Sequence, residues 1–189
     1  MAMPSETGLA RRQQVMLEIW EGHMRSEFED HSADAALETM SAAPHLNHVP
    51  VMTGGGGREE IHTFYATRFI PRMPPDVAIE LISRTIGQDR LVDELIFTCT
   101  HSVAMDWFLP GVPPTGRRIE VPMVVVIAFK DDKIESEHIY WDQASVLVQI
   151  GLLDGGKLPV AGVQTANKIR DPSLPANTLI TRTTARDQA

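Results

Sequence analysis

Cysteine is nearly absent from this sequence: Cys99 is the only one, so no intramolecular disulfide can form. Its position within an apolar stretch is typical of a small buried hydrophobic side chain. Positive charge is also scarce, because 17 Lys and Arg stand against 25 Asp and Glu, giving a formal net charge of −8 with no basic cluster. We therefore exclude nucleic acid and anionic membrane surfaces as expected partners.

Long apolar runs are missing as well. No stretch approaches the roughly 18 uninterrupted apolar residues that a membrane span requires. Residues 1–12 also lack the apolar core of a secretory signal. Together with the single cysteine, these absences predict a cytoplasmic protein.

The overall composition is that of an ordinary globular protein, with 43% hydrophobic and 22% charged residues. A chain of 189 residues can bury a sufficient core as one domain. After Leu158 the hydrophobic periodicity ends, and prolines recur in the remaining sequence. We therefore expect a single domain over residues 1–158 and an extended or disordered tail over residues 159–189.

Apolar residues at three- and four-residue spacing predict amphipathic helices in the first third of the chain. In the opening helix this stripe includes Met16, Trp20, His23 and Phe28. We expect helices over residues 7–31, 32–40 and 58–69, with a short strand over residues 45–52. The four glycines at 54–57 lack the Gly-Lys-Ser/Thr ending of a phosphate-binding loop, so we interpret them as a flexible link that could also act as a gate.

From about residue 77 the hydrophobic period changes to two, which indicates β-strands. We expect strands over residues 77–87, 90–105, 117–130 and 133–142. Short polar turns join them as hairpins. Helices first and an antiparallel meander later predict an α+β protein, in which about three helices cover one face of a curved antiparallel sheet and close a cone around a pocket.

The last expected strand ends on a carboxylate beside apolar and aromatic residues, which makes that carboxylate a candidate proton shuttle. Strict alternation places one set of side chains on a common face: Ile134, Ser136, His138, Tyr140 and Asp142. The opposite face then carries Glu135, Glu137, Ile139 and Trp141. His138 and Asp142 are about 13 Å apart along an extended chain, so we expect them to line different depths of one cavity.

This segment resembles the end of the SnoaL-like polyketide cyclases, which share the cone-shaped fold of nuclear transport factor two. In that family an Asp follows eight residues after the Ile of the last strand, and Gln-Leu-Gly follows seven residues after the Asp. Ile134, Asp142 and Gln149–Gly151 keep these spacings. Asp132 replaces the family's turn glycine, and His138 stands where the family usually has Trp.

Two further motifs carry the same resemblance. Thr100 and His101 match the family's Gly-Thr-His on a middle strand, and residues 114–117 match its Pro-Thr-Gly-Lys turn. The likeness covers residues 10–153. It implies the nuclear transport factor two-like fold and a homodimer packed through the outer face of the sheet.

Asp142 has two interpretations. The resemblance assigns it the acid/base role, which an apolar pocket would support by raising its pKa above the usual value of about 3.9. Alternatively, Asp142 is a structural cap for a helix that begins near Ala144. His138 is the second catalytic candidate, as a donor or acid to a developing oxyanion, against the alternative of a satisfied interior histidine.

Five further side chains are expected to bind the substrate: His48, His101, Trp107, Tyr140 and Trp20. The large apolar residues of loop 107–114 predict that this loop folds over the cavity mouth or packs on a partner subunit. His45 and His48 invite a metal interpretation, but residues three apart on a strand face opposite sides. We therefore expect no metal. His48 rather than His45 is expected to reach the pocket, with a surface histidine as the alternative.

These expectations favour a cofactor-independent enzyme that moves a proton beside the carbonyl of a small, largely apolar substrate, as in aldol cyclisation, isomerisation or dehydration. One alternative is attack of water on a lactone or enone. No Gly-x-Ser-x-Gly motif supports covalent hydrolysis. The other alternative is a noncatalytic dimeric module that binds a small ligand.

Overall fold

The computed structural model describes residues 6–156 and 158–187. Residues 1–5, 157 and 188–189 lie outside the described part, including the end of the expected tail. The helices are α1 (Glu6–Phe28), α2 (Ala33–Glu38), α3 (Arg58–Phe64), α4 (Gln143–Gln149), α5 (Gln164–Arg170) and α6 (Thr178–Asp187). A π-helical turn η1 (Tyr65–Phe69) and a 3₁₀ turn η2 (Ile70–Arg72) follow α3. The strands are β1 (Met40–His48), β2 (Thr53–Gly56), β3 (Ala78–Ile86), β4 (Arg90–Thr100), β5 (Arg118–Lys130) and β6 (Lys133–Trp141).

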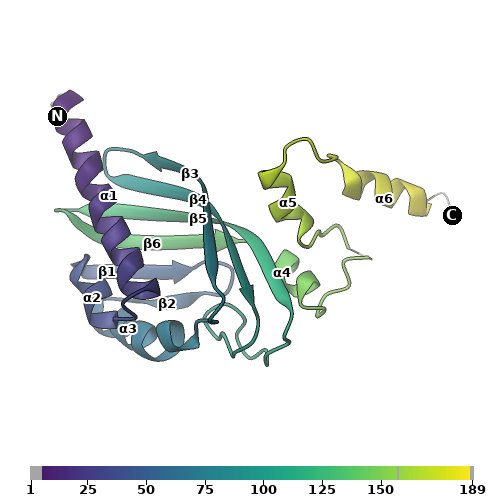
Figure 1. Ribbon diagram of the computed structural model, residues 1–189, viewed down its shortest axis with the longest axis horizontal. Helices are drawn as coiled ribbons and strands as arrows, with labels where there is room; N and C mark the ends of the chain where they lie inside the picture. Colours follow the sequence, from purple (N-terminus) through teal and green to yellow (C-terminus); the bar gives the residue numbers. More distant parts are fainter. Residues whose placement is uncertain (1–5, 157, 188–189) are drawn as a thin grey trace.

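The six strands form one curved, open sheet in the order β2-β1-β6-β5-β4-β3. β1 and β6 run parallel, and the other neighbouring strands are antiparallel. Figure 1 shows α1 lying across one face of the sheet, with α2 and α3 beside β1 and β2. The predicted α+β class, a curved sheet with helices over one face, is confirmed.

Helix α1 places one stripe of side chains against the inner face of the sheet, where it contacts β4 and β6. Met16, Trp20, His23 and Glu27 lie on this stripe at four- and three-residue spacing, and all four are buried. The helix stops at Phe28. None of the described helices combines the length and apolar character needed to cross a membrane.

The core fills the space between the first three helices and the inner sheet face. It contains the inward-facing residues of β4 and β5, for example Leu95, Phe97 and Val121. Loop residues Trp107 and Phe108 are buried in the same core. The aromatic loop therefore packs inside the cone, and its large side chains become part of the cavity wall.

One extra residue in β6 decides which of its side chains face the core. Ile134 pairs with Phe129 of β5, and Ser136 pairs with Ala128. The residue between them, Glu135, has no partner in β5 and forms a β-bulge. Because a one-residue shift exchanges the two faces of a strand, Glu137 points to the core and His138 points outward. Strict alternation from Ile134 therefore gave the wrong face for every later residue of this strand.

The glycine run forms a strand rather than a flexible link. Thr53–Gly56 is β2, which pairs antiparallel with the end of β1. Gly54 has φ +136°, and a Cβ at this position would lie 2.1 Å from the main-chain oxygen of Leu46. Only glycine allows this approach. The carboxylate of Glu60 also accepts a hydrogen bond of 2.9 Å from the main-chain N–H of Gly56.

Residues after 158 contain two helices where we expected an extended or disordered tail. Helix α5 contacts β5. Its Arg170 donates hydrogen bonds to Glu80 of β3 at 2.7 Å and to Glu120 of β5 at 2.6 Å. Part of the outer sheet face is therefore covered by α5, while α6 extends away from the rest of the molecule (Figure 1). The expected homodimer through this face stays a prediction.

Candidate functional site

A mainly apolar cavity lies between α1 and the inner face of the sheet. Its volume is ≈ 70 Å³, the space of about two water molecules and about half that of an apolar cavity that encloses a benzene ring. Trp20 from α1, Leu46 from β1, Phe69 from η1 and Ile139 from β6 form much of the apolar wall. Such a cavity can hold one apolar edge of a small ring away from bulk water, while the rest of the ring lies towards the groove outside.

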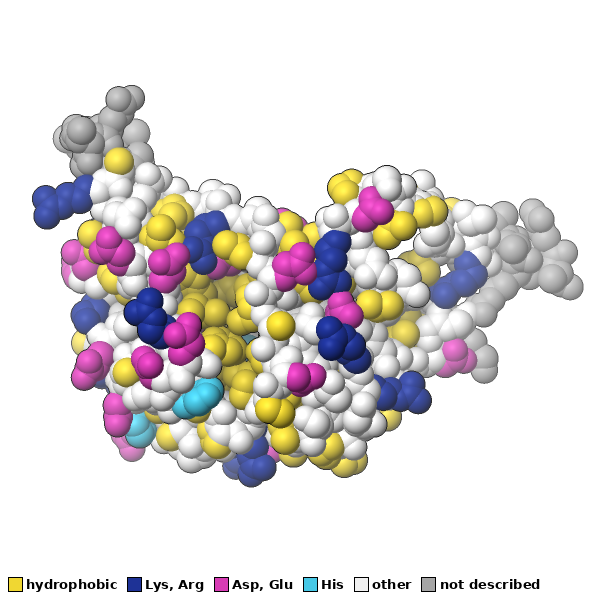
Figure 2. All heavy atoms as spheres, viewed as in Figure 1, with side chains coloured by type: hydrophobic (Ala, Val, Ile, Leu, Met, Phe, Trp, Pro, Cys, Tyr) yellow, Lys and Arg dark blue, Asp and Glu magenta, His cyan; other side chains and the backbone are white. Residues whose placement is uncertain are grey.

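The cavity opens between the end of α1 and the start of β3. Met24, Phe28 and Ile79 line both the cavity and a wider groove outside it. Figure 2 shows apolar side chains inside a hollow near the middle of this face. Arg25 and Arg84 line the outer groove, so a polar part of a longer ligand can remain solvated there while its ring enters the cavity.

Four buried polar side chains meet at the cavity: Glu27 and His23 from α1, Tyr65 from η1 and Glu137 from β6. His23 Nε2 lies 3.2 Å from Glu27 Oε1 and 3.1 Å from Glu137 Oε1. The Tyr65 hydroxyl lies 3.3 Å from the same nitrogen. Glu27, Tyr65 and Glu137 line the cavity, whereas His23 lies behind them. We call these four residues the acid/base cluster.

The far side of the His23 ring is held by the start of the sheet. Nδ1 lies 2.7 Å from the Thr39 hydroxyl and 3.2 Å from the carbonyl oxygen of Ala36. A carbonyl only accepts, so Nδ1 carries a proton and Nε2 faces the two carboxylates. The ring also stacks on Trp20, with centroids 5.7 Å apart and planes 13° apart. The orientation of His23 is therefore fixed from both sides.

Burial and the neighbouring charges together raise the pKa of three members of the cluster. Burial alone would lower the pKa of His23, but attraction to Glu137 and Glu27 outweighs it and raises the value to about 9. Burial raises the pKa of Glu137 to about 7, against the attraction of His23 and with the repulsion of Glu27. Burial likewise raises the pKa of Tyr65 well above its usual value. Glu137 can therefore gain or lose a proton near neutrality while His23 stays cationic.

Glu137 has capacity left for a ligand. Its Oε1 lies at ion-pair distance from His23 but not in hydrogen-bonding alignment, and the atom is buried without a hydrogen-bond partner. Since Glu137 lines the cavity, a bound molecule can reach this carboxylate. A carboxylate in an apolar site whose pKa is near 7 is suited to taking and returning a proton.

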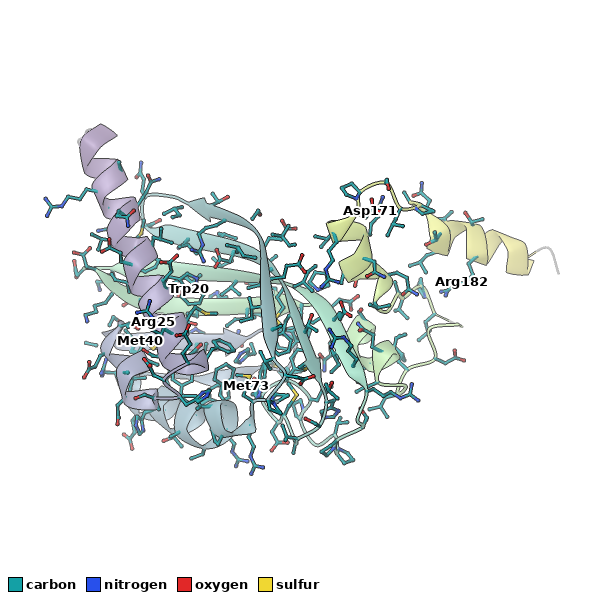
Figure 3. The ribbon with its side chains drawn as sticks, viewed as in Figure 1. Trp20, Arg25, Met40, Met73, Asp171 and Arg182 are labelled. Carbon is teal, nitrogen blue, oxygen red and sulfur yellow. The ribbon has the colours of Figure 1, made fainter. Side chains whose placement is uncertain are left out.

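Trp20 is fixed as a wall of the cavity by a buried ion pair. Its Nε1 donates a 2.8 Å hydrogen bond to Asp93 of β4. Arg84 binds the same carboxylate through two nitrogens, at 2.6 and 2.8 Å. In Figure 3 Trp20 lies over the sheet, and the contact to Asp93 joins α1 to β4 there. These contacts keep the indole in one orientation next to His23.

His48 and Trp107 form the aromatic end of the cavity. The His48 ring lies 5.5 Å from Trp107 and 5.6 Å from Phe64, centroid to centroid. Burial lowers the pKa of His48 to about 4, although a hydrogen bond to the main chain of Thr53 opposes this. His48 is therefore neutral at physiological pH. His48 Nδ1 and Trp107 Nε1 are both buried without a hydrogen-bond partner.

Three of the predicted site residues line the cavity, namely Trp20, His48 and Trp107. Asp142 does not: it is exposed and sits at the N-terminus of α4. Its Oδ1 accepts hydrogen bonds from the main-chain N–H groups of Ala144 at 2.9 Å and Ser145 at 3.2 Å. The expected apolar surroundings are therefore wrong for Asp142, and the helix-cap alternative describes its contacts.

Three other predicted residues also lie elsewhere. His138 is on the outer face of the sheet, where its Nε2 is 3.3 Å from Nδ1 of His45. Tyr140, 43% exposed, shares that face because of the bulge in β6. His101 is buried as expected, but it lies outside the cavity, and its Nδ1 contacts the Thr115 hydroxyl at 3.2 Å.

Sequence reasoning missed Glu27, Tyr65 and Glu137, and it placed His23 only on the buried stripe of the first helix. The signal for Glu27 was present, because it follows His23 by four residues on the helix stripe. Glu137 was missed because the bulge at Glu135 turns it inward, and no local sequence pattern in β6 predicts that bulge. The predicted separation of His45 and His48 to opposite faces is confirmed. Within the described ranges, no group of three or more His, Cys, Asp or Glu side chains is arranged to hold a metal ion.

The fold and the cavity define a cone-shaped α+β protein whose first helix and curved sheet enclose an acid/base cluster. Within this class the chain belongs to the SnoaL-like polyketide cyclase family, whose sequence profile matches residues 10–150. The resemblance identified from the last strand is thereby confirmed.

Solved structures share the fold. A putative SnoaL-like polyketide cyclase from Jannaschia sp. CCS1 is 20% identical with a TM-score of 0.58, over 82% of this chain and 100% of the other. A putative polyketide cyclase from Acidithiobacillus ferrooxidans is 18% identical with a TM-score of 0.56, over 79% and 97%. A protein with a ketosteroid isomerase-like fold from Catenulispora acidiphila DSM 44928, in complex with trimethylamine, is 20% identical with a TM-score of 0.55, over 72% and 94%. No curated protein matches the chain.

Proposed function

We propose that this protein is a cyclase or isomerase that moves a proton beside a carbonyl group of a small, largely apolar substrate, with Glu137 as the acid/base. The observation that carries the proposal is a buried carboxylate that faces an apolar cavity and contacts a buried histidine. Membership in the SnoaL-like polyketide cyclase family supports the same class of reaction. Asp142 and His138 are replaced in this role because neither lines the cavity.

The reaction begins with Glu137 in its carboxylate form. It takes a proton from the carbon next to the carbonyl, and the electrons of the broken C–H bond form an enolate. In an isomerisation, the neutral Glu137 returns the proton to another carbon of the conjugated system. In a cyclisation, the enolate carbon attacks a second carbonyl carbon, and the new alkoxide receives the proton. Either sequence leaves Glu137 as it started.

The other members of the acid/base cluster hold Glu137 ready for both steps. The His23 imidazolium attracts the carboxylate and prevents burial from raising the pKa of Glu137 further. Glu27 has the opposite effect through its negative charge.

The test uses a small cyclic ketone, whose ring can enter the cavity from the groove outside. Cyclohexanone in deuterated water exchanges the hydrogens next to its carbonyl, and NMR follows the loss of their signal. We expect the protein to accelerate this exchange and Glu137→Gln to lower the acceleration by about 10²-fold or more. The rate should rise with pH through about 7, because the carboxylate form of Glu137 is the base.

Asp142→Asn and His138→Gln are the matched controls. Asn keeps the capping oxygen at the start of α4, and position 138 lies on the outer face, so both variants should retain the exchange rate within about twofold. A normal rate in Glu137→Gln, or a loss in Asp142→Asn that matches the expected loss in Glu137→Gln, contradicts the proposal. Binding of cyclohexanone without any accelerated exchange would favour the noncatalytic ligand-binding alternative.

A further inference from the structure

Two ring nitrogens at the aromatic end of the cavity have hydrogen-bonding capacity that proton transfer by Glu137 does not explain. His48 Nδ1 and Trp107 Nε1 are buried without a partner, both side chains line the cavity, and the two rings are in contact. Among the described residues the other buried side-chain atoms of this kind belong to Glu137, Ser41 and His101. Glu137 is the acid/base, and the last two lie outside the cavity.

The two nitrogens are complementary rather than equivalent. Burial keeps the His48 ring neutral. A neutral imidazole has one N–H and one acceptor nitrogen, so the unpartnered Nδ1 accepts when the proton is on Nε2. The indole Nε1–H of Trp107 is only a donor. One wall of the cavity therefore presents an acceptor next to a donor.

Thr53 holds both rings in place. It lies opposite His48 in the strand pair, and its hydroxyl donates a 2.7 Å hydrogen bond to the main-chain oxygen of Trp107. Thr53 is the first residue of β2, which pairs directly with His48 of β1. The donor and the acceptor are thus fixed by strand pairing, as a preformed binding site requires.

We propose that His48 and Trp107 form a subsite for a hydroxyl group of the substrate; this rests on the acid/base function proposed for the same cavity. A hydroxyl oxygen accepts from Trp107 while its O–H donates to His48, so it satisfies both rings, whereas a carbonyl oxygen satisfies only Trp107. We call this pair of side chains the hydroxyl subsite.

The register of the sheet sets how far this hydroxyl lies from the reacting carbon. His48 pairs with Ile139, and Leu46 pairs with Glu137. Two residues along a strand span roughly 7 Å, close to the width of a substituted six-membered ring. The substrate class is therefore a cyclic or ring-forming hydroxyketone whose hydroxyl lies across the ring from the carbon that exchanges its proton.

The test compares cyclohexanol with methylcyclohexane, which has a similar shape and no hydrogen-bonding group. Trp107→Phe and His48→Phe each remove one partner and keep an aromatic ring. We expect each variant to weaken cyclohexanol binding about fivefold or more, while methylcyclohexane changes by less than about twofold. Equal effects on both compounds overturn the proposal, as does the absence of cyclohexanol binding up to its solubility limit.

Cyclohexanone separates the two partners. Its oxygen can only accept, so Trp107→Phe should weaken its binding, and His48→Phe should leave the dissociation constant within about twofold. A loss in both variants would mean that the replacements disturb the cavity in general, which contradicts a specific hydroxyl subsite.

A measurement on the unaltered protein covers the case in which a variant fails to fold. The sequence has three tryptophans, and two of their N–H groups already have partners: Trp20 bonds to Asp93 and Trp141 to Gln143. Cyclohexanol should shift the indole N–H signal of Trp107 in an NMR spectrum and leave the other two unchanged. An unchanged Trp107 signal at saturating cyclohexanol overturns the proposal.

Glu137→Gln distinguishes a failure of the hydroxyl subsite from a failure of the proposed function. If Glu137 is the acid/base and the subsite is real, this variant loses hydrogen exchange on cyclohexanone but keeps the Trp107 response to cyclohexanol. If exchange persists in this variant while the Trp107 response is present, the assignment of Glu137 is wrong and the subsite stands. Loss of exchange without any Trp107 response in the unaltered protein removes the subsite alone.

Discussion

A histidine lies on each side of β6, His23 of α1 against the inner face and His138 of β6 itself on the outer face, and the two differ in burial, partners and pKa. On the inner face, fully buried His23 contacts two carboxylates, which raise its pKa to about 9. On the outer face, half-buried His138 faces another histidine, and burial together with the neighbouring positive charges of His45 and Arg90 lowers its pKa. The groups that surround a histidine, rather than its position beside the sheet, decide whether it can take part in acid/base chemistry.

The same contrast exists between adjacent residues of one strand. Glu137 faces the cavity and His138 faces outward, although a single peptide bond joins them. The bulge at Glu135 determines this assignment. The bulge thereby brings the Glu137 carboxylate, which would otherwise be solvated, into an apolar interior. Burial there raises its pKa to about 7, where it can exchange a proton near neutral pH.

The largest expected effect is on the free energy of unfolding, which should fall much more for a substitution in the core than for one on the outer face. Phe69 packs against Trp107 at 4.9 Å and Tyr65 at 5.7 Å, centroid to centroid. Phe69→Ala should therefore lower the free energy of unfolding by about 3–5 kcal/mol. Tyr140→Ala on the outer face should cost less than about 1 kcal/mol, since that side chain is 43% exposed. Urea denaturation of both variants measures the difference, and equal losses would show that the outer face is covered in solution.

A second prediction concerns the pH dependence of stability. The folded-state pKa of Glu137 is raised from 4.5 to about 7, and that of His23 from 6.5 to about 9. Between the unfolded-state and folded-state pKa of each group, the folded protein binds more protons than the unfolded chain. The free energy of unfolding therefore falls as pH rises from about 4.5 to about 9. The His23 part is complete below pH 6.5 and is lost through about pH 9, on the order of 3 kcal/mol.

Two variants isolate this effect in denaturation curves recorded across the pH range. Glu137→Gln removes one titrating group and the attraction that contributes most to raising the pKa of His23, so its stability should depend less steeply on pH. His62 is exposed and pairs with exposed Asp34, so His62→Gln should keep the slope of the unaltered protein. An unchanged slope in Glu137→Gln would mean that the buried pair does not control the titration.

Much of the fold could be predicted because local patterns are repeated over many residues. The stripe from Met16 to Phe28 predicts α1. The helix expected over residues 32–40 is observed as α2, and Ser32 caps it by accepting a hydrogen bond from Ala35 N–H at 3.1 Å. The alternation in β4 also predicts its inner face correctly, the one with Leu91, Leu95 and Phe97. The strand at Thr53–Gly56 was missed because its glycines satisfy a close backbone approach, which propensity does not record.

The site could be predicted only in part, since its chemistry depends on contacts between distant segments. Trp20, His48 and Trp107 were identified from their apolar surroundings, and they line the cavity. The partners of Glu137 come from α1 and η1, far away in the sequence, and its inward orientation depends on one inserted residue. A single-residue change of register outweighs the alternation of a whole strand.

The smallest expected effect tests the outer histidine pair directly. Burial, His45 and Arg90, in that order, lower the pKa of His138. His45→Gln removes one positive neighbour, so the pKa of His138 should rise while remaining below its ordinary value of 6.5, because burial is the largest cause and is unchanged. NMR titration of the histidine ring protons measures this shift. A further decrease in the pKa of His138 would show that His45 stabilises the cation by hydrogen bonding, and the outer pair would then resemble the inner one more than its geometry indicates.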